Sequence, residues 1–463
     1  MDRESFLHLM AVGRGDQPAD LVLRNGRVVN VFTGEIQDAD IAIAGEWIAA
    51  VGHGYAGEVE LDLGGQTVVP GLVDTHVHIE SSMCTPPQFA RAVVPHGTTT
   101  AITDPHEIAN VAGGAGIRYM LAASEGLPLT VFVNLPSCVP ATHMGTAGAR
   151  LEAYDLEALS RLPRVLGLAE FMNVPGAVLG LEGALEKLLA FQGKHIDGHA
   201  PGISGPWLQA YVAAGPSTDH ESMTREEALE KVRLGMYVLI RQATAAQNLR
   251  ALVPAVTPEN ARRFAFATDD RHPHDLLEEG HIDHLVRMAM AEGLDPITVI
   301  RMATLNAVEA FGLRDRGAIG PGRRADLVVT PTLEAFRAAL VFSGGALVAQ
   351  EGVAVGTWPE PEVDDRAVRS SIHVDLEQLS FRIPAAGSKL RVVGLIPDQV
   401  LTEMRIMEAS IMEGEAVADV GRDLLKLATV ERHHNTGNVG LGFVQGLRSE
   451  ERRVGKECRS RWA

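Results

Sequence analysis

The sequence predicts an α/β fold, with a (β/α)8 TIM-like barrel over residues 71–313 and a small β domain drawn from both flanks of the barrel. Three observations lead to this prediction. The chain has 463 residues, which is too long for one ordinary hydrophobic core. Strand and helix patterns alternate eight times over about 240 residues, as they do in a parallel barrel. The segments before and after these repeats carry short strand patterns instead.

Composition narrows the class of protein. Hydrophobic residues make up 46% of the chain and charged residues 22%, which is ordinary for a globular protein. The net charge of -18 argues against nucleic acid as the main partner, because phosphate binding requires a basic surface. Apolar runs are too short to span a membrane, and the start of the chain lacks the layout of a signal peptide. We therefore expect a cytoplasmic protein without a membrane or nucleic-acid partner.

The flanking domain is expected in residues 1–70 and 314–365. In "DLVLRNGRVVNVFTG" the apolar positions alternate around Asn25-Gly26, a pair that favours a two-residue hairpin. The strand pattern returns in "RGAIGPGRRADLVVT" and "AALVFSGGALVAQEG", which would complete the sheet begun before residue 70. A linker rich in proline and acidic residues, "TWPEPEVDD", then leads to a third segment, residues 366–447.

Eight short stretches within the barrel region are predicted to be strands. They are residues 71–78, 98–104, 129–135, 164–172, 195–201, 217–222, 236–242 and 264–270. Helical patterns separate them. One helix, "TREEALEKVRLG", opens with Thr224 and Glu227 at capping-box spacing and ends on Gly235.

Polar residues that can bind metals follow these predicted strands. His76, His78 and Glu80 alternate along the first strand and therefore share one face. The ends of other strands carry Asp104, His106, Glu107, Glu170, His199, His220, Glu221, Asp269 and Asp270. In such barrels the active site lies at the C-terminal ends of the strands. Burying imidazoles and carboxylates is costly unless a partner such as a metal ion compensates them, so we expect a metal centre.

The donor types indicate the chemistry. Imidazole and carboxylate ligands suit zinc, iron or manganese, and the absence of a thiolate set argues against a structural zinc site. Glu170 is placed to bridge two ions, and Asp269, at the end of the last strand, suits proton transfer. A metal-bound hydroxide would then be the nucleophile of a hydrolase.

Several motifs are similar to those of a known family. The His-x-His after "PGLVD", single histidines on the fifth and sixth strands and an aspartate on the eighth resemble the amidohydrolase superfamily. Within it, "HIESSM", "TDPHEIANV", "GLAEFM", "DGHAPG", "DHES" and "TDDRHP" resemble the adenine deaminases of the microbial type. The resemblance covers residues from about 20 to 445. It implies that the flanking domain is a small β-sandwich built by both flanks, as in other members.

The resemblance also implies roles for named residues. His76 and His78 would hold one of two divalent metal ions per chain, manganese or iron, with zinc also suitable. Glu170 would bridge the two ions, His199 and His220 would hold the second, and Asp269 would contact metal. The expected catalytic residues are Asp269, Glu107 and His220, with Asp269 as the proton shuttle and Glu107 against the adenine ring.

The roles of four further residues are open. Glu107 could be only a helix-start residue, and Glu80 could form an ion pair or orient a histidine. Asp270 and Arg271 are expected to lie behind the ligands.

The implied reaction is hydrolytic deamination of adenine to hypoxanthine and ammonia, in purine salvage, by a homo-oligomer. The alternatives are cyclic amide hydrolysis, deamination of a different nucleobase, a purine-binding module without turnover, or an inactive fragment. A glycine-rich region with a His-Asp-Ser-His motif, expected in this family, is missing from the sequence. We therefore expect residues 366–447 to be an incomplete C-terminal α+β domain, and the basic residues 448–463 to be a non-native tail.

Overall fold

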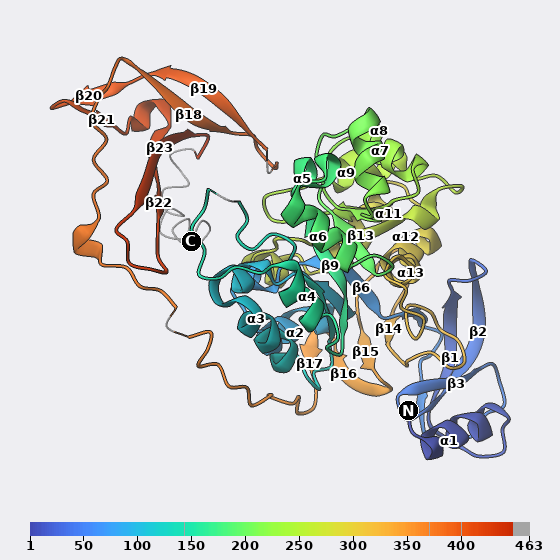
Figure 1. Ribbon diagram of the computed structural model, residues 1–463. Coiled ribbons are helices and arrows are strands. Elements are labelled where there is room, and N and C mark those ends of the chain that lie inside the picture. The colour runs from blue at the N-terminus through green and yellow to red at the C-terminus, as the bar shows by residue number, and fades with distance from the viewer. Residues whose placement is uncertain (143, 370, 400, 448–463) are drawn as a thin grey trace.

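The computed structural model describes residues 1–142, 144–369, 371–399 and 401–447 (Figure 1). The predicted non-native tail, residues 448–463, lies outside the described residues. Among the described residues, no helix combines the length and the apolar character that crossing a bilayer requires.

Eight parallel strands form the predicted barrel in two arcs. The larger arc is a five-stranded sheet of order β10-β9-β8-β7-β6, and the smaller is a three-stranded sheet of order β11-β12-β13. Their bounds are β6 Leu72–Val77, β7 Thr98–Thr103, β8 Thr130–Leu135, β9 Val165–Phe171, β10 His195–Gly198, β11 Thr218–Asp219, β12 Tyr237–Arg241 and β13 Phe264–Ala267. Each strand lies inside one of the eight predicted stretches, so the barrel prediction is confirmed.

The two arcs meet at two seams. At one seam Val77 and Asp269 form a parallel bridge, and the Asp269 N–H donates to the His76 carbonyl over 2.9 Å. At the other seam, in the described chain, no strand ladder joins β10 to β11, and the Ser217 N–H donates to the Ile196 carbonyl over 3.0 Å. The barrel is therefore closed by only a few backbone bonds at each seam.

Helices cover the outside of the barrel. Their bounds are α2 Pro86–Val93, α3 His106–Ala123, α4 Ala153–Leu159, α5 Val174–Leu179, α6 Glu182–Ala190, α7 Gly205–Ala213, α8 Arg225–Arg233, α9 Leu249–Leu252, α10 Pro273–Glu278, α11 Ile282–Ala291, α12 Pro296–Ala303 and α13 Leu305–Ala310. Short 3-10 turns lie at Ile79–Ser82, Val94–His96, Val253–Ala255 and Ala261–Arg263. Helix α8 begins as predicted, because the Thr224 side chain accepts the Glu227 N–H over 3.3 Å.

The flanking domain is one hydrogen-bonded path of strands from both sides of the barrel. Its order is β17-β16-β15-β14-β5-β1-β2-β3, with β4 paired to β1. The bounds are β1 Ala19–Asn30, β2 Glu35–Ala44, β3 Trp47–Val51, β4 Gly57–Asp62, β5 Thr67–Pro70, β14 Leu327–Thr330, β15 Leu340–Ser343, β16 Ala346–Gln350 and β17 Val353–Ala354. Helix α1, Arg3–Gly13, packs on β2 and β3. Antiparallel pairing of β5 with β14 joins the two flanks.

The hairpin predicted at Asn25-Gly26 is wrong. Both residues lie inside β1, where the register against β2 shifts between Leu23 and Gly26 and forms a bulge. Asn25 has a φ of 56°, and its N–H donates to Asp40 over 2.9 Å. The left-handed conformation that asparagine tolerates is therefore used in a bulge, not in a turn.

The C-terminal region is a separate lobe that an extended linker joins to β17 of the flanking domain (Figure 1). Its four-stranded sheet has the order β19-β18-β23-β22, and β20 pairs with β21. The bounds are β18 Lys389–Leu395, β19 Thr402–Glu408, β20 Ser410–Met412, β21 Glu415–Val417, β22 Leu424–Val430 and β23 Val439–Gln445. Its described residues contain only short 3-10 turns, Leu376–Gln378 and Val420–Arg422, and no α-helix. The α+β character that we expected is thus not seen, because alternating apolar residues such as those of β18 form strands.

Candidate metal centre

Two histidines at the end of β6 face each other inside the barrel. His76 and His78 are both buried, and their Nε2 atoms lie 3.1 Å apart. His78 Nδ1 lies 2.9 Å from the carbonyl oxygen of Asp104, so it must carry the hydrogen. His76 Nδ1 lies 2.8 Å from Asp197 Oδ2, which favours the same tautomer. Both Nε2 lone pairs are therefore available at one point, the arrangement that a metal ion requires.

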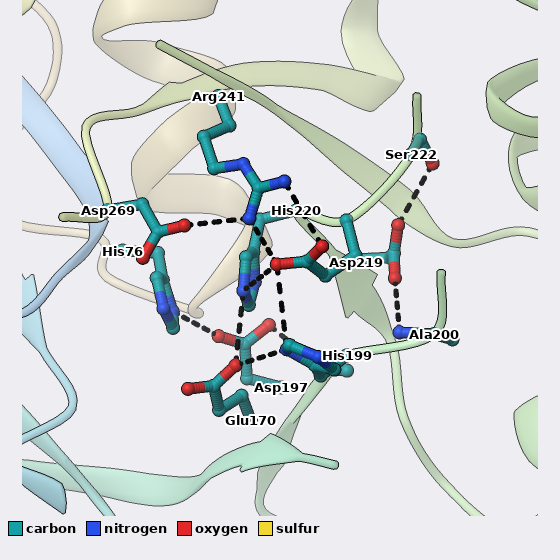
Figure 2. Close-up of polar contacts among 12 residues, drawn as sticks. His76, Glu170, Asp197, His199, Ala200, Asp219, His220, Ser222, Arg241 and Asp269 are labelled. Atoms are coloured by element: carbon teal, nitrogen blue, oxygen red, sulfur yellow. Dashed lines mark hydrogen bonds and ion pairs between the residues drawn. The ribbon is translucent and has the colours of Figure 1, made fainter. Parts of the chain in front are cut away.

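The side chain of Glu170 faces His199 and His220 (Figure 2). From the end of β9 its Oε1 is 3.6 Å from His78 Nε2. Its Oε2 is 2.5 Å from His199 Nδ1 and 3.2 Å from His220 Nε2. One carboxylate thus contacts histidines from three strand ends, which is the position expected of a bridging ligand.

Asp269 completes the cluster from the loop after β13. Its Oδ1 lies 3.3 Å from His78 Nε2, and its Oδ2 accepts a hydrogen bond from Arg241 over 2.8 Å. Asp269 has a φ of 55°, held by the bridge to Val77. The structure therefore brings all six predicted ligands, His76, His78, Glu170, His199, His220 and Asp269, into one connected cluster.

Charges in the cluster are shared between imidazoles and carboxylates. Burial opposes ionisation of Glu170, but the charge of His199 and the hydrogen bonds from His106, His199 and His220 together hold the pKa of Glu170 well below its usual range. Burial likewise opposes charge on His220, but its bond to Glu170 raises the pKa of His220 to about 10. A metal ligand must be a neutral imidazole or an ionised carboxylate, so a bound divalent cation would replace the protons that the imidazoles carry here.

The donor set fits divalent metal ions. Groups of potential ligands whose donor atoms lie within 4.8 Å of one another include His76 with Glu170 and His220, and His76 with His78 and Asp269. A further such group is His199 with His220 and Glu221. The buried His220 Nδ1 and Asp104 Oδ1 have no hydrogen-bond partner. Convergent imidazoles and carboxylates without thiolates suit zinc, manganese or iron in a catalytic site.

Two further carboxylates lie beside the cluster. Glu107, at the start of α3, places Oε1 3.5 Å from His78 Nδ1 and 3.3 Å from His106 Nε2. Burial opposes its ionisation, but those two imidazoles lower the pKa of Glu107 to about 2. Glu80 accepts the Ile108 N–H over 3.3 Å, and burial together with the charge of Glu107 raises the pKa of Glu80 to about 8. Each carboxylate has one buried Oε2 without a partner.

The residues expected behind the ligands differ in position. Asp270 accepts a hydrogen bond from Ser81, next to the first strand. Arg271 points elsewhere and pairs with Glu279 over 2.5 Å and with the Gly280 carbonyl over 3.0 Å.

Three buried charged groups next to the ligands were missed by the sequence reasoning. Asp197 supports His76 from β10, where it alternates with His199 and so shares its face. Arg241, at the end of β12, forms ion pairs with Glu221 and Asp269. Lys231 on α8 forms an ion pair with Asp219 over 2.7 Å. A charged residue at the C-terminal end of an apolar strand is the signal that would have found Arg241.

Comparisons with known proteins agree with this geometry. Residues 67–353 match the model of the Amidohydrolase family, and residues 399–455 match that of the Adenine deaminase C-terminal domain. Adenine deaminase of Desulfatibacillum aliphaticivorans is 51% identical over 441 residues, 95% of this chain and 77% of that protein. Adenine deaminase 2 of Carboxydothermus hydrogenoformans is 49% identical, again over 95% of this chain and 77% of the relative.

Solved structures show the same fold at low identity. β-Aspartyl dipeptidase of Fervidobacterium islandicum AW-1 has a TM-score of 0.53 at 17% identity, over 73% of this chain and 98% of that one. Atrazine chlorohydrolase of Arthrobacter aurescens TC1, complexed with zinc, has a TM-score of 0.53 at 17% identity, over 72% and 96%.

A (β/α)8 barrel with imidazoles and carboxylates gathered at its strand ends is typical of metal-dependent hydrolases. The family match covers the whole barrel, and the relatives match nearly the whole chain. The chain therefore belongs to the amidohydrolase family and, within it, to the adenine deaminases.

Proposed function

We propose that this protein catalyses the hydrolytic deamination of adenine to hypoxanthine and ammonia, as part of purine metabolism. The observation that carries the proposal is 51% identity to an adenine deaminase over 95% of the chain. Cyclic amide hydrolysis and deamination of another base are not favoured, because the named relatives share one reaction.

The six clustered residues are proposed as ligands of two divalent ions. His76 and His78 would hold one ion and His199 and His220 the other, with Glu170 between them. Manganese or iron is our expectation, with zinc also compatible with these donors. When bound, such ions lower the pKa of water far enough to give a nucleophile near neutral pH.

Asp269 is proposed to move the proton. It would accept a proton from the attacking water and return it to the departing amine, which leaves C6 as ammonia. Burial opposes its charge, but contact with His78 and the Arg241 guanidinium hold the pKa of Asp269 well below its usual range. Arg241 also holds the carboxylate in place over 2.8 Å, so the base is both ionised and oriented.

Glu107 is proposed to contact the adenine ring, together with its neighbour Glu80. With a pKa of about 2, Glu107 is a carboxylate, whereas Glu80, with a pKa of about 8, carries a proton at neutral pH. The pair can therefore offer both an acceptor and a proton: the proton would reach N1 as charge develops there, and the proton of the C6 hydroxyl would return to the pair as hypoxanthine forms.

The test is turnover of adenine by the purified protein after reconstitution with Mn²⁺, with metal content measured on the same sample. Hypoxanthine and ammonia should appear in equal amounts, and guanine and cytosine in parallel reactions should give neither ammonia nor product. Two bound metals without adenine turnover, or faster turnover of another base, would contradict the proposal.

A further inference from the structure

A fully buried lysine lies behind the ligands of the smaller arc. Lys231, on α8, has an exposed fraction of 0%. Its ammonium donates to Asp219 Oδ2 over 2.7 Å and to the Ala200 carbonyl over 2.8 Å. It also lies 3.1 Å from Ser222 Oγ and 3.0 Å from Glu227 Oε1. Lysine is almost never fully buried unless its charge is paired, and here Asp219 provides the paired charge. Burying such a pair is costly, so the question is what the pair does.

Asp219, the partner of Lys231, is hydrogen-bonded to the backbone next to His199 and lies next to His220 in the chain (Figure 2). Asp219 directly precedes His220, and its Oδ1 accepts the N–H of Ala200 over 2.9 Å. Ala200 directly follows His199. Asp219 Oδ2 also accepts the Ser222 hydroxyl over 2.9 Å. The ion pair therefore binds both backbone groups of Ala200, which follows His199: Asp219 accepts its N–H and Lys231 donates to its carbonyl. Because Asp219 itself precedes His220, the pair connects the two histidine loops.

This contact spans the seam at which backbone pairing is weakest. His199 follows β10, which ends the five-stranded sheet, and His220 follows β11, which is two residues long in the other sheet. In the described chain no strand ladder fixes the distance between these two histidines. The hydrogen bonds of Lys231 and Asp219 cross that seam instead.

We propose that the Lys231–Asp219 ion pair is a positioning device that sets the spacing of His199 and His220 so that together they hold one metal ion. Neither residue of the pair contacts substrate, and both act through the backbone of the histidine loops. The inference rests on the proposed function, since it concerns the same metal centre. It predicts that binding of the second ion depends on the contacts that cross the seam between β10 and β11.

Two variants test the pair. Lys231→Met removes the charge at similar length but leaves Asp219 unpaired, which can compromise folding. The double variant Lys231→Met/Asp219→Asn removes both charges and keeps an oxygen that can accept the Ala200 N–H. The matched control is Glu227→Gln, which changes another partner of Lys231 and leaves the bond to Asp219 intact.

The measurements are binding of Mn²⁺ alone, by competition with a chelator, and circular dichroism with thermal unfolding of the metal-free proteins. The folded double variant should bind one Mn²⁺ as the parent protein does and the second roughly 10- to 100-fold more weakly. Its kcat should fall with an unchanged KM for adenine, and Glu227→Gln should match the parent protein in Mn²⁺ binding.

The proposal is overturned if the folded double variant binds both ions with the affinity of the parent protein, since the pair would then be only a packing feature. It is equally overturned if both ions weaken together. Mn²⁺ binding is measured without adenine, so this test does not depend on the proposed reaction. A parent protein that binds two ions but does not deaminate adenine would contradict the proposed reaction only.

Discussion

The two arcs of the barrel hold the residues of the candidate metal centre by opposite means. In the five-stranded arc, His76 and His78 are held by acceptors, the Asp197 carboxylate and the Asp104 carbonyl. In the three-stranded arc, the ligand loops are held by donors: Lys231 and Arg241, both with exposed fractions of 0%. One arc supports its imidazoles with oxygen atoms, and the other supports its carboxylates with cations.

This difference follows from strand length and charge. In the larger arc, strands of four to seven residues are each hydrogen-bonded to the next strand, which fixes the backbone positions of the histidines. The supporting groups there need only to fix the tautomer of each imidazole. The smaller arc contains the two-residue β11 and three buried carboxylates: Asp219 in β11, Glu221 just after it, and Asp269 after β13. Buried carboxylates need partners, and two cations provide them while also fixing the loops.

The largest expected effect comes from the residue that the arcs share. Glu170→Gln keeps the shape of the side chain but removes the charge that faces histidines of both arcs. We expect loss of metal binding in both positions and a fall in kcat/KM of at least roughly 10⁴-fold, the upper end of what one catalytic group contributes. Metal analysis and adenine turnover are the measurements. The exposed Glu186→Gln serves as control, and retention of both ions in Glu170→Gln would show that the arcs bind metal independently.

The next largest effect concerns the cations of the smaller arc. Arg241→Met leaves Glu221 and Asp269 buried without their shared partner. We expect the free energy of unfolding of the metal-free protein to fall by about 3–5 kcal/mol, measured in urea. Arg250→Met, which breaks an exposed pair with Glu292, should cost no more than about 1 kcal/mol. Equal losses in the two variants would remove the distinction between the arcs.

Much of the barrel could be predicted from the sequence because most of its strands, such as β8, β12 and β13, are short apolar runs followed by polar residues. The clustering of the proposed ligands was predictable for the same reason: His76, Glu170 and Asp269 stand where such runs end. Asn25-Gly26 was misread because a residue that tolerates positive φ serves equally in a hairpin and in a bulge, and only the partner strand decides between them.

The supporting charges could not be predicted, because local sequence does not reveal which charges are buried. Lys231 sits in "REEALEKVR", a segment in which six of the nine residues are charged, as is typical of an exposed helix. Its burial depends on Asp219 and Ala200, which come from two other strand ends. A three-dimensional contact between separate loops decides the role of this residue.

An intermediate effect is expected in the larger arc. Asp197→Asn keeps an oxygen for His76 Nδ1 but removes the negative charge that makes the imidazole a stronger ligand. Burial opposes that charge, but the bond to His76 lowers the pKa of Asp197 to about 2, so the parent carboxylate is ionised at all working pH values. We expect a loss of Mn²⁺ affinity of roughly 10- to 100-fold, read by chelator competition. The exposed Asp16→Asn is the control, and unchanged affinity in Asp197→Asn would mean that charge support matters only in the smaller arc.

The smallest effect should arise where the C-terminal domain reaches the smaller arc. The Asn248 amide donates to Gln399 over 3.3 Å, and Asn248 Oδ1 accepts from Arg241 over 3.2 Å. Gln399→Ala should therefore loosen Arg241 by one neutral hydrogen bond, about 1 kcal/mol, and lower kcat about fivefold with metal content unchanged.

The matched control lies on the larger arc. There the C-terminal domain touches the loop after β8 through His434 Nε2, 3.1 Å from the Ala147 carbonyl, an exposed contact that leads to no ligand. His434→Ala should leave kcat unchanged. If the two substitutions lowered kcat equally, the C-terminal domain would act on the site through its overall docking. If only Gln399→Ala lowered kcat, the domain would act through Arg241, the cation that holds Asp269, and the contrast between the arcs would extend to their contacts with the C-terminal domain.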